Sequence, residues 1–239
     1  MKCEGGIEFF EETGGPFEIW EEPDEYEWKN RYLVVVDIGG RGHKSDWSVI
    51  TVFDRMNDSE LPAVVAQWRG HDDYDKIAQT AASIGEFYQN ALLVIESNSL
   101  ETRDRERYVD GEQAPFILQE LADLYPNLYM RVSPGGTARP GFHTNSSTKP
   151  MVIGTLVKMV REGLYIERDM KAIEELIQYE RKSNGSYGAY IGCHDDILMT
   201  RAIGLHIHEH EMEPPVRRPW LLKKKNNRYR GPQDAFGIF

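Results

Sequence analysis

Cysteines are scarce in this sequence, and long apolar runs are missing. The two cysteines, Cys3 and Cys193, lie about 190 positions apart, so they provide neither a disulfide framework nor a CxxC zinc half-site. No apolar run approaches the roughly 18 to 20 residues that a membrane span needs, and residues 1–6 lack the basic and then apolar order of a signal peptide. These absences predict a cytoplasmic protein of a reducing compartment with no membrane partner.

Basic residues are also in deficit. The 239 residues include 28 Lys and Arg against 39 Asp and Glu, for a formal net charge of −11, while 40% of them are hydrophobic. That composition suffices for a folded core. The excess acid argues against a protein that holds nucleic acid through its overall electrostatic field.

The charge is distributed unevenly along the chain. Residues 1–29 hold two basic and ten acidic residues, a balance of −8, whereas residues 214–239 hold seven basic residues and one acidic residue, a balance of +6. The basic segment mixes prolines with arginines and lysines and shows neither a helical nor a strand period, which predicts an extended arm. We therefore divide the chain into an acidic leader (1–29), one domain (30–213) and a basic tail (214–239).

Apolar patterning predicts the first half of a mixed sheet. Residues 32–36, YLVVV, form a continuous apolar run that is typical of a strand buried on both faces. Short loops connect this run to expected strands over 47–53 and 63–68, as in an antiparallel meander. Helical spacing over 71–90 precedes another apolar strand over 91–95, which predicts a β-α-β crossover with parallel neighbouring strands.

The second half of the domain repeats and extends this pattern. A helix over 114–125 and a strand over 128–132 would form a further β-α-β unit. The remaining expected elements are helices over 151–161 and 169–179, an Asn-Gly hairpin at 183–186 and a last helix from residue 194. The expected fold class is therefore α/β, with antiparallel strands 1 to 3 and then parallel β-α-β units in one mixed sheet flanked by helices.

Acidic residues stand at the ends of three predicted core elements. Asp37 ends the most apolar run, Glu96 ends the strand over 91–95, and Asp195 and Asp196 begin the last helix. If the first and fourth strands are adjacent and parallel, Asp37 and Glu96 project from the same end of the sheet, where a cation relieves their repulsion. Asp46 is placed to return to that end through the intervening turn. Each acid also has a structural alternative, as a turn former or, for Asp195, as a helix N-cap.

An oxygen-only ligand set of this kind favours Mg²⁺ or Mn²⁺. Two such ions, held about 3.5 to 4 Å apart, can activate a water and stabilise the leaving oxygen in phosphodiester cleavage. The acidic residues thus point to metal-dependent phosphodiester hydrolysis as one function of the chain.

These motifs resemble the nuclease domain of the large terminase subunit of tailed bacteriophages. The resemblance spans roughly residues 15–210 in unchanged motif order, and it is carried by 32–53 (YLVVVDIGGRGHKSDWSVITVF), 93–98 (LVIESN), 148–166 (TKPMVIGTLVKMVREGLYI) and 192–199 (GCHDDILM). It implies a ribonuclease H-like fold related to RuvC resolvases. It also implies an endonuclease that cuts concatemeric viral DNA during genome packaging with two Mg²⁺ or Mn²⁺ ions.

The resemblance assigns roles to the acidic residues. Asp37 matches the first-strand aspartate, Glu96 the fourth-strand glutamate and the Asp195-Asp196 pair the final acidic motif, while Asp46 matches the second aspartate of a Gly-rich hairpin. By resemblance, Asp37, Glu96 and Asp196 are catalytic and all five acids are metal ligands, with Asp196 favoured over Asp195 as the ligand of the final pair. The final motif departs from the family at Thr200, where alanine is frequent.

A full large terminase begins with an ATPase, and its GxxxxGK[ST] phosphate loop does not occur in this sequence. The resemblance is therefore to the nuclease half, with residues 1–29 as an interdomain segment and 17–20 as an added edge strand. It implies double-stranded DNA as substrate in the cytoplasm of a bacterial host. The implied protein partners are the terminase ATPase domain, the small terminase subunit and the portal.

Basic residues near a Gly/Pro-rich loop at 133–141 are candidates for contacts with DNA. Arg139, His143 and Lys149 form a local basic cluster on a predicted surface segment, and phosphate contacts need local positive charge even where the overall charge is negative. The alternating charges at 101–107 instead indicate pairs within a helix. His206 and His210 have the i, i+4 spacing of a metal chelate, but no cysteine or acid follows at zinc spacing.

Two other functions are compatible with parts of the sequence. Residues 37–40, DIGG, also look like the first phosphate loop of the actin and sugar-kinase superfamily, although the second Asp-Gly motif and the duplicated lobe of that superfamily are missing. The third hypothesis is a catalytically silent DNA-packaging module. ATP binding distinguishes the actin and sugar-kinase hypothesis, and metal binding with DNA cleavage distinguishes the nuclease from the silent module.

Overall fold

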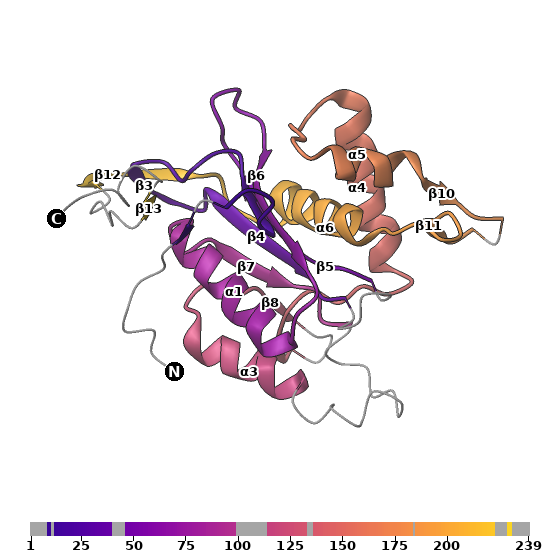
Figure 1. The fold of residues 1–239 in the computed structure, drawn as a ribbon, viewed down its shortest axis with the longest axis horizontal. Coiled ribbons are helices and arrows are strands. Elements are labelled where there is room, and N and C mark those ends of the chain that lie inside the picture. Colours follow the sequence, from indigo (N-terminus) through magenta and orange to yellow (C-terminus); the bar gives the residue numbers. More distant parts are fainter. Residues whose placement is uncertain are drawn as a thin grey trace.

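A computed structural model of the chain describes residues 9–10, 12–39, 46–98, 114–132, 136–183, 185–222 and 229–230. Its centre is a five-stranded sheet with the order β2-β6-β5-β4-β7 (Figure 1). These strands are β2 (Phe17–Ile19), β4 (Tyr32–Asp37), β5 (Ser48–Asp54), β6 (Ala63–Gly70) and β7 (Leu92–Ile95). Strands β2, β6, β5 and β4 pair antiparallel, and β4 pairs parallel with β7. The expected mixed sheet, including the edge strand near residue 17, is confirmed.

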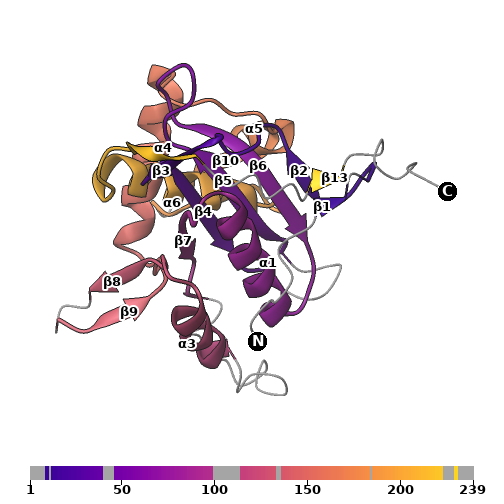
Figure 2. The ribbon, with the colours of Figure 1, turned by 90° about the vertical axis from the view of Figure 1, so that its left-hand side faces the viewer.

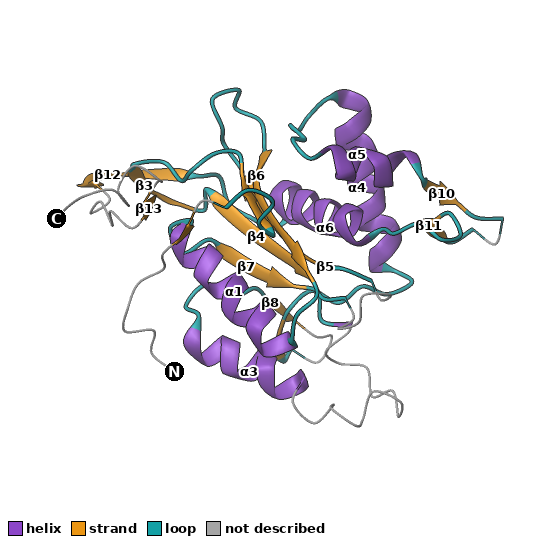
Figure 3. Cartoon of the chain, in the orientation of Figure 1, coloured by secondary structure: helices purple, strands orange, loops and turns teal. Residues whose placement is uncertain are grey.

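Helices cover both faces of the sheet (Figure 3). On one side lie α1 (Tyr74–Phe87) and α3 (Ala114–Leu124), and on the other lie α4 (Thr148–Glu162), α5 (Met170–Ile177) and α6 (Asp196–His210). None of the helices in the described ranges has the length and apolarity to cross a bilayer.

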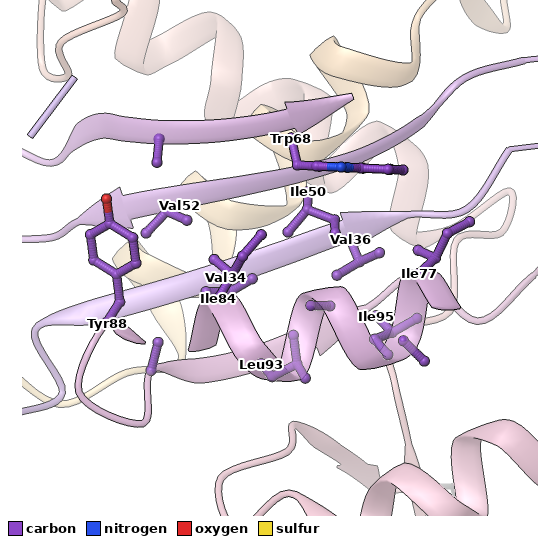
Figure 4. Close-up of a cluster of buried hydrophobic side chains, with 14 of the residues drawn as sticks. Val34, Val36, Ile50, Val52, Trp68, Ile77, Ile84, Tyr88, Leu93 and Ile95 are labelled. Carbon is purple, nitrogen blue, oxygen red and sulfur yellow. The ribbon is translucent and has the colours of Figure 1, made fainter. Parts of the chain in front are cut away.

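Side-chain alternation along β4 explains how one strand serves two cores. Val34 and Val36 belong to the cluster beneath α1, where Ile77 and Ile84 pack against the sheet (Figure 4). The intervening Val35 faces the opposite cluster with residues of α4 and α6. Because both faces are covered, the strand is apolar throughout until its last residue, and the first polar side chain stands at the rim of the sheet.

The segment beyond β7 differs from the single strand expected over 128–132. Residues 127–129 and 141–142 bond to β7 in turn, and between them the chain leaves the sheet as the hairpin of β8 (Met130–Val132) and β9 (Ala138–Pro140) (Figure 2). Gly141 allows the return, because its φ is +83° and a Cβ there would lie 2.7 Å from the carbonyl oxygen of Ile95. The Gly/Pro-rich loop is thus partly strand.

Two described parts of the basic tail form strands, where the sequence predicts an extended arm. In the structure, β12 (Val216–Leu222) pairs antiparallel with β3 (Tyr26–Lys29) in the leader, and β13 (Tyr229–Arg230) pairs parallel with β1 (Phe9–Phe10). One ion pair of 3.9 Å, between Glu27 of β3 and Arg218 of β12, spans the first pairing. The division at 29 and 213 remains a prediction.

The expected hairpin near residue 184 is present as β10 (Tyr179–Arg181) and β11 (Tyr187–Ala189). Gly185 adopts a φ of +84° in its turn, as a tight hairpin requires. Asn184 itself, and the charged residues Arg103, Arg105 and Arg107, lie outside the described residues.

Candidate metal centre

Strand pairing brings Asp37 and Glu96 to the same end of the sheet. Val36 lies opposite Ile95 in the parallel register of β4 and β7, and the backbone N–H of Glu96 donates to the carbonyl of Val36 at 2.8 Å. The next residue of each strand is the acid. Glu96 is 6% exposed, so its carboxylate sits where apolar packing ends, as the sequence predicts.

Asp196 comes to this end of the sheet from the first turn of α6. Its carboxylate is buried, and Oδ2 accepts a hydrogen bond of 2.9 Å from the backbone N–H of Trp47, just before β5. Asp195 occupies the N-cap position, but its side chain makes no capping hydrogen bond among the described residues. Instead, its Oδ2 lies 3.4 Å from Nζ of Lys149. The structure therefore gives the two adjacent acids different surroundings.

Asp46, His194 and Asp196 form a group that could hold a metal ion. One potential ligand atom from each lies within 4.8 Å of the others. Nδ1 of His194 is 3.6 Å from Oδ1 of Asp46 and 3.6 Å from Oδ2 of Asp196. Sequence reasoning missed His194, and the available signal was its position two residues before Asp196 within the motif 192–199. The expected return of Asp46 is found.

Electrostatics link all five acids. The pKa of Asp37 is raised well above its ordinary value, first by burial and then by the negative charges of Glu96, Asp196, Asp195 and Asp46. Burial also raises the pKa of Asp196 to about 6, against the opposing hydrogen bond from Trp47. Such crowding of carboxylates is unfavourable without a cation. Hard oxygen donors with one imidazole suit Mg²⁺ and Mn²⁺, so the residues fit the expected ions.

A buried glutamate fixes the helix that carries Asp196. Oε2 of Glu175, in α5, accepts a hydrogen bond of 2.8 Å from the backbone N–H of Leu198 in the first turn of α6. That N–H has no partner within its own helix, so the carboxylate supplies a cap that Asp195 does not. Burial raises the pKa of Glu175 to about 7, with a further contribution from Asp196.

The middle of α6 is fixed by a polar network beneath the sheet. Arg201 is fully buried, and its guanidinium donates to Glu167 at 3.0 Å and to the hydroxyl of Thr51 at 2.6 Å. The Oγ1 atoms of Thr51 and Thr200 are 2.7 Å apart. Thr200, the departure from the family's alanine, therefore has a local reason in this chain: its hydroxyl belongs to the network that joins α6 to β5.

The three basic candidates have different neighbours in the structure. Lys149 lies next to Asp195 at the rim of the metal centre. Arg139 and His143 instead line a cavity of about 510 Å³ between the β8–β9 hairpin, α4 and the end of α6. Their contact with DNA remains a prediction, now divided between two places.

Protein groups contact the residues of two other candidate sites. The Oγ1 of Thr155 lies 3.1 Å from Nδ1 of His206 and 3.5 Å from Nε2 of His210, and burial lowers the pKa of His206. The histidine pair thus faces a hydroxyl. At the turn that resembles a phosphate loop, the N–H of Gly39 donates to Oγ of Ser48 at 3.1 Å, and backbone of residues 46–47 closes against it. This packing leaves little room for a phosphate at Gly39.

Comparison with known proteins places this geometry in a known fold. Neither a protein-family model nor a curated protein matches the sequence. Among solved structures, the large terminase nuclease of thermophilic phage G20c aligns with bound cobalt (TM-score 0.59) and with bound magnesium (TM-score 0.56), each at 21% identity over 84% of this chain and 92% of that chain. The chain has the fold of a large terminase nuclease.

A second phage nuclease supports this terminase nuclease fold. The large terminase nuclease domain of Thermus phage P74-26 aligns with a TM-score of 0.53 and 20% identity over 87% of this chain and 93% of that chain. The mixed sheet of a ribonuclease H-like domain, expected from the motifs, is thereby confirmed. At identities near 20%, the likeness establishes the fold, and the activity rests on the residues of this chain.

Proposed function

We propose that this chain is the metal-dependent DNA endonuclease domain of a phage large terminase subunit. The observation that carries the proposal is the convergence of Asp37, Glu96 and Asp196 at one end of a sheet with the terminase nuclease fold. Mutual repulsion of these acids favours divalent cations in that place. The similar nuclease of phage G20c has been solved with cobalt and with magnesium bound, which agrees with this proposal.

The acids have separate parts in the proposed reaction. Two Mg²⁺ or Mn²⁺ ions would supply an activated water and stabilise the departing 3′ oxygen, leaving 5′-phosphate and 3′-hydroxyl ends. Asp37 and Glu96 hold the cations from the rigid strand ends, and Asp196 holds them from α6. Asp46, Asp195 and His194 would complete the ligand set at the rim. Lys149 beside Asp195 is suited to contact the DNA backbone.

The proposed biological setting follows from the same resemblance. The substrate is concatemeric double-stranded viral DNA, cut during genome packaging in the cytoplasm of the bacterial host. The terminase ATPase domain, the small terminase subunit and the portal would deliver and position that DNA. Delivery matters because the chain's net charge of −11 opposes DNA binding by the isolated protein.

Plasmid cleavage tests the proposal directly. With Mn²⁺ or Mg²⁺ the purified chain should nick and then linearise supercoiled plasmid, and EDTA should stop the reaction. Asp37→Ala and Glu96→Ala should each lower the rate by at least about 100-fold, because each removes a ligand from the ions. Asp58→Ala, at an exposed aspartate in a turn, is the matched control and should cleave normally. Full activity in either site variant would refute the assignment.

A silent packaging module remains the competing hypothesis, and the same variants separate it from a nuclease. A silent module would leave plasmid intact at every metal concentration, even where Mn²⁺ binding by Asp37 and Glu96 can be measured by calorimetry. A nuclease binds Mn²⁺ and cleaves plasmid, and the Asp37→Ala variant should lose both the binding and the cleavage.

A further inference from the structure

The cavity beside the β8–β9 hairpin has two chemically different ends. Arg131, Arg139 and His143 line it toward the hairpin, and Glu211 lines it at the end of α6. Aromatic side chains, Tyr129 among them, form part of the wall between these ends. Its volume of about 510 Å³ lies in the range of small-molecule sites.

The basic end is an arrangement that favours an anion. Arg131 and Arg139 are directly opposite each other in the antiparallel register of β8 and β9. Opposite residues point to the same face, which places two positive charges on one side of the hairpin. Arg139 is exposed and forms no ion pair with any residue that the structure describes. A phosphate beside Arg139 is attracted by both positive charges and accepts hydrogen bonds from the Arg139 guanidinium.

The negative charge at the acidic end of the cavity repels a second phosphate, but this end can bind a nucleobase. Oε2 of Glu211 accepts a hydrogen bond of 2.7 Å from the hydroxyl of Tyr129, which fixes the carboxylate at the hydroxyl end of that side chain. Oε1 lies 4.0 Å from Nε2 of His206. A carboxylate in this position accepts from an amino group such as N4 of cytosine, while the ring of Tyr129 offers a face for stacking.

The cavity adjoins the candidate metal centre through the residues after β7. Nη1 of Arg131 donates to Oγ of Ser97 at 2.8 Å, and Ser97 follows Glu96 directly. The backbone N–H of Ser97 donates to the carbonyl of Phe142 at 2.8 Å, and Phe142 is itself part of the wall. The cavity is therefore joined to the candidate metal centre through Ser97, the residue that follows Glu96.

We propose that this cavity binds one unpaired nucleotide of a DNA strand, with its phosphate at the basic end beside Arg139, its base stacked on the ring of Tyr129 and an amino group of the base directed at Glu211. The proposal rests on the nuclease function, because it is the metal centre that brings a strand to the cavity. It adds a preference to that function: the strand is held best where at least one nucleotide is unpaired, and a base with an amino group is favoured over thymine.

Binding of short single strands, measured by fluorescence anisotropy in EDTA, tests the proposal without cleavage. The full chain should bind fluorescein-labelled (dC)10 about fivefold more tightly than (dT)10, since thymine presents a carbonyl where cytosine presents an amine. Arg139→Ala should weaken (dC)10 binding about tenfold through loss of a charged phosphate contact. Arg161→Ala, at an exposed arginine of α4 outside the cavity, should bind like the unaltered chain.

The base end has its own variant. Glu211→Gln offers both a donor and an acceptor, so the preference for (dC)10 should disappear while binding to (dT)10 is kept. Equal affinity of Arg139→Ala and Arg161→Ala for (dC)10 overturns the proposal, and so does equal binding of both strands by the unaltered chain.

The outcome for the cavity is independent of the outcome for the nuclease. Asp37→Ala protein should still show the Arg139-dependent binding of (dC)10, although it no longer cuts plasmid. Cleavage without such binding refutes the cavity alone. Arg139-dependent binding without cleavage refutes the nuclease and leaves the nucleotide site.

Discussion

The imidazole of His194 distinguishes this candidate metal centre from a site built of carboxylates alone. Its Nδ1 lies 3.6 Å from both Asp46 and Asp196, and its side chain is 42% exposed. A nitrogen ligand is accepted more readily by Mn²⁺ than by Mg²⁺, which prefers oxygen. His194 therefore affects the preference between Mn²⁺ and Mg²⁺ more than it affects the total affinity of the site for metal.

We predict that His194→Ala lowers Mn²⁺ affinity about tenfold and Mg²⁺ affinity less, because only the nitrogen donor is lost. Calorimetric titration of each ion into metal-free protein measures both changes. His210→Ala, at an exposed histidine at the far end of α6, should leave both affinities unchanged. Identical Mn²⁺ binding by His194→Ala and the unaltered chain would exclude His194 as a ligand.

Residues of the site differ in how far the sequence predicts them. Asp37 and Glu96 end apolar runs, and a parallel pairing of those runs brings the acids together, so pattern alone locates them. His194 and Glu175 follow no pattern of this kind. The role of His194 arises where the start of α6 packs near the start of β5, and the role of Glu175 arises where α5 packs against α6. Spacing along the sequence does not predict such tertiary contacts.

At the scale of elements, the first turn of α6 depends on a buried carboxyl group from a neighbouring helix. The pKa of Glu175 is raised to about 7 mainly by burial, so the folded protein binds a proton here that the unfolded chain releases near pH 4.5. Where an acid has a higher pKa in the folded protein than in the unfolded chain, the protein becomes less stable as the pH rises from the lower pKa to the higher one. Glu175 therefore favours the folded state less at pH 8 than at pH 5.

Glu175→Gln should remove that dependence, since the amide oxygen still accepts from Leu198 and carries no charge. We expect the variant to be more stable than the unaltered chain at pH 8, by up to about 3 kcal/mol, and to differ little at pH 5. Urea unfolding in EDTA at the two pH values measures the difference. The Glu175→Ala variant should be less stable than the unaltered chain at both pH values, because it leaves the N–H of Leu198 unpaired. A Gln variant that is less stable at pH 8 contradicts the role given to burial.

Elements were predicted best where burial determines the pattern. The run YLVVV is β4, and helical spacing gives α1 correctly, because both pack into clusters that exclude water. The strand expected over 128–132 is wrong in part, since exposed Met130 and Val132 leave the sheet in the hairpin with β9. Apolar residues predict a strand there, and only the position of Gly141 indicates where the chain returns.

On the scale of the whole molecule, the opposite charges of the two ends have a structural use. The leader carries −8 and the tail +6, and β3 and β12 pair antiparallel. Among the described residues, Glu27 of β3 and Arg218 of β12 form one ion pair of 3.9 Å, and the acidic residues of the chain include the five of the candidate metal centre. The net charge of −11 thus includes the clustered carboxylates, and it also makes the overall electrostatic field of the chain unfavourable for DNA binding.

If the tail is part of the fold, a change in β12 should weaken the whole domain. The guanidinium of Arg217 lies 3.7 Å from the ring centroid of Tyr26 in β3, a cation–π contact worth about 0.5 to 1 kcal/mol at an exposed site. Arg217→Ala should lower the free energy of unfolding by that amount in urea titrations. Arg218→Ala, whose pair with Glu27 spans 3.9 Å between exposed side chains, is the matched control and should cost less. Equal stability of Arg217→Ala and the unaltered chain would show that β12 pairs with the leader without stabilising it, and the tail would then be free to serve DNA or another protein.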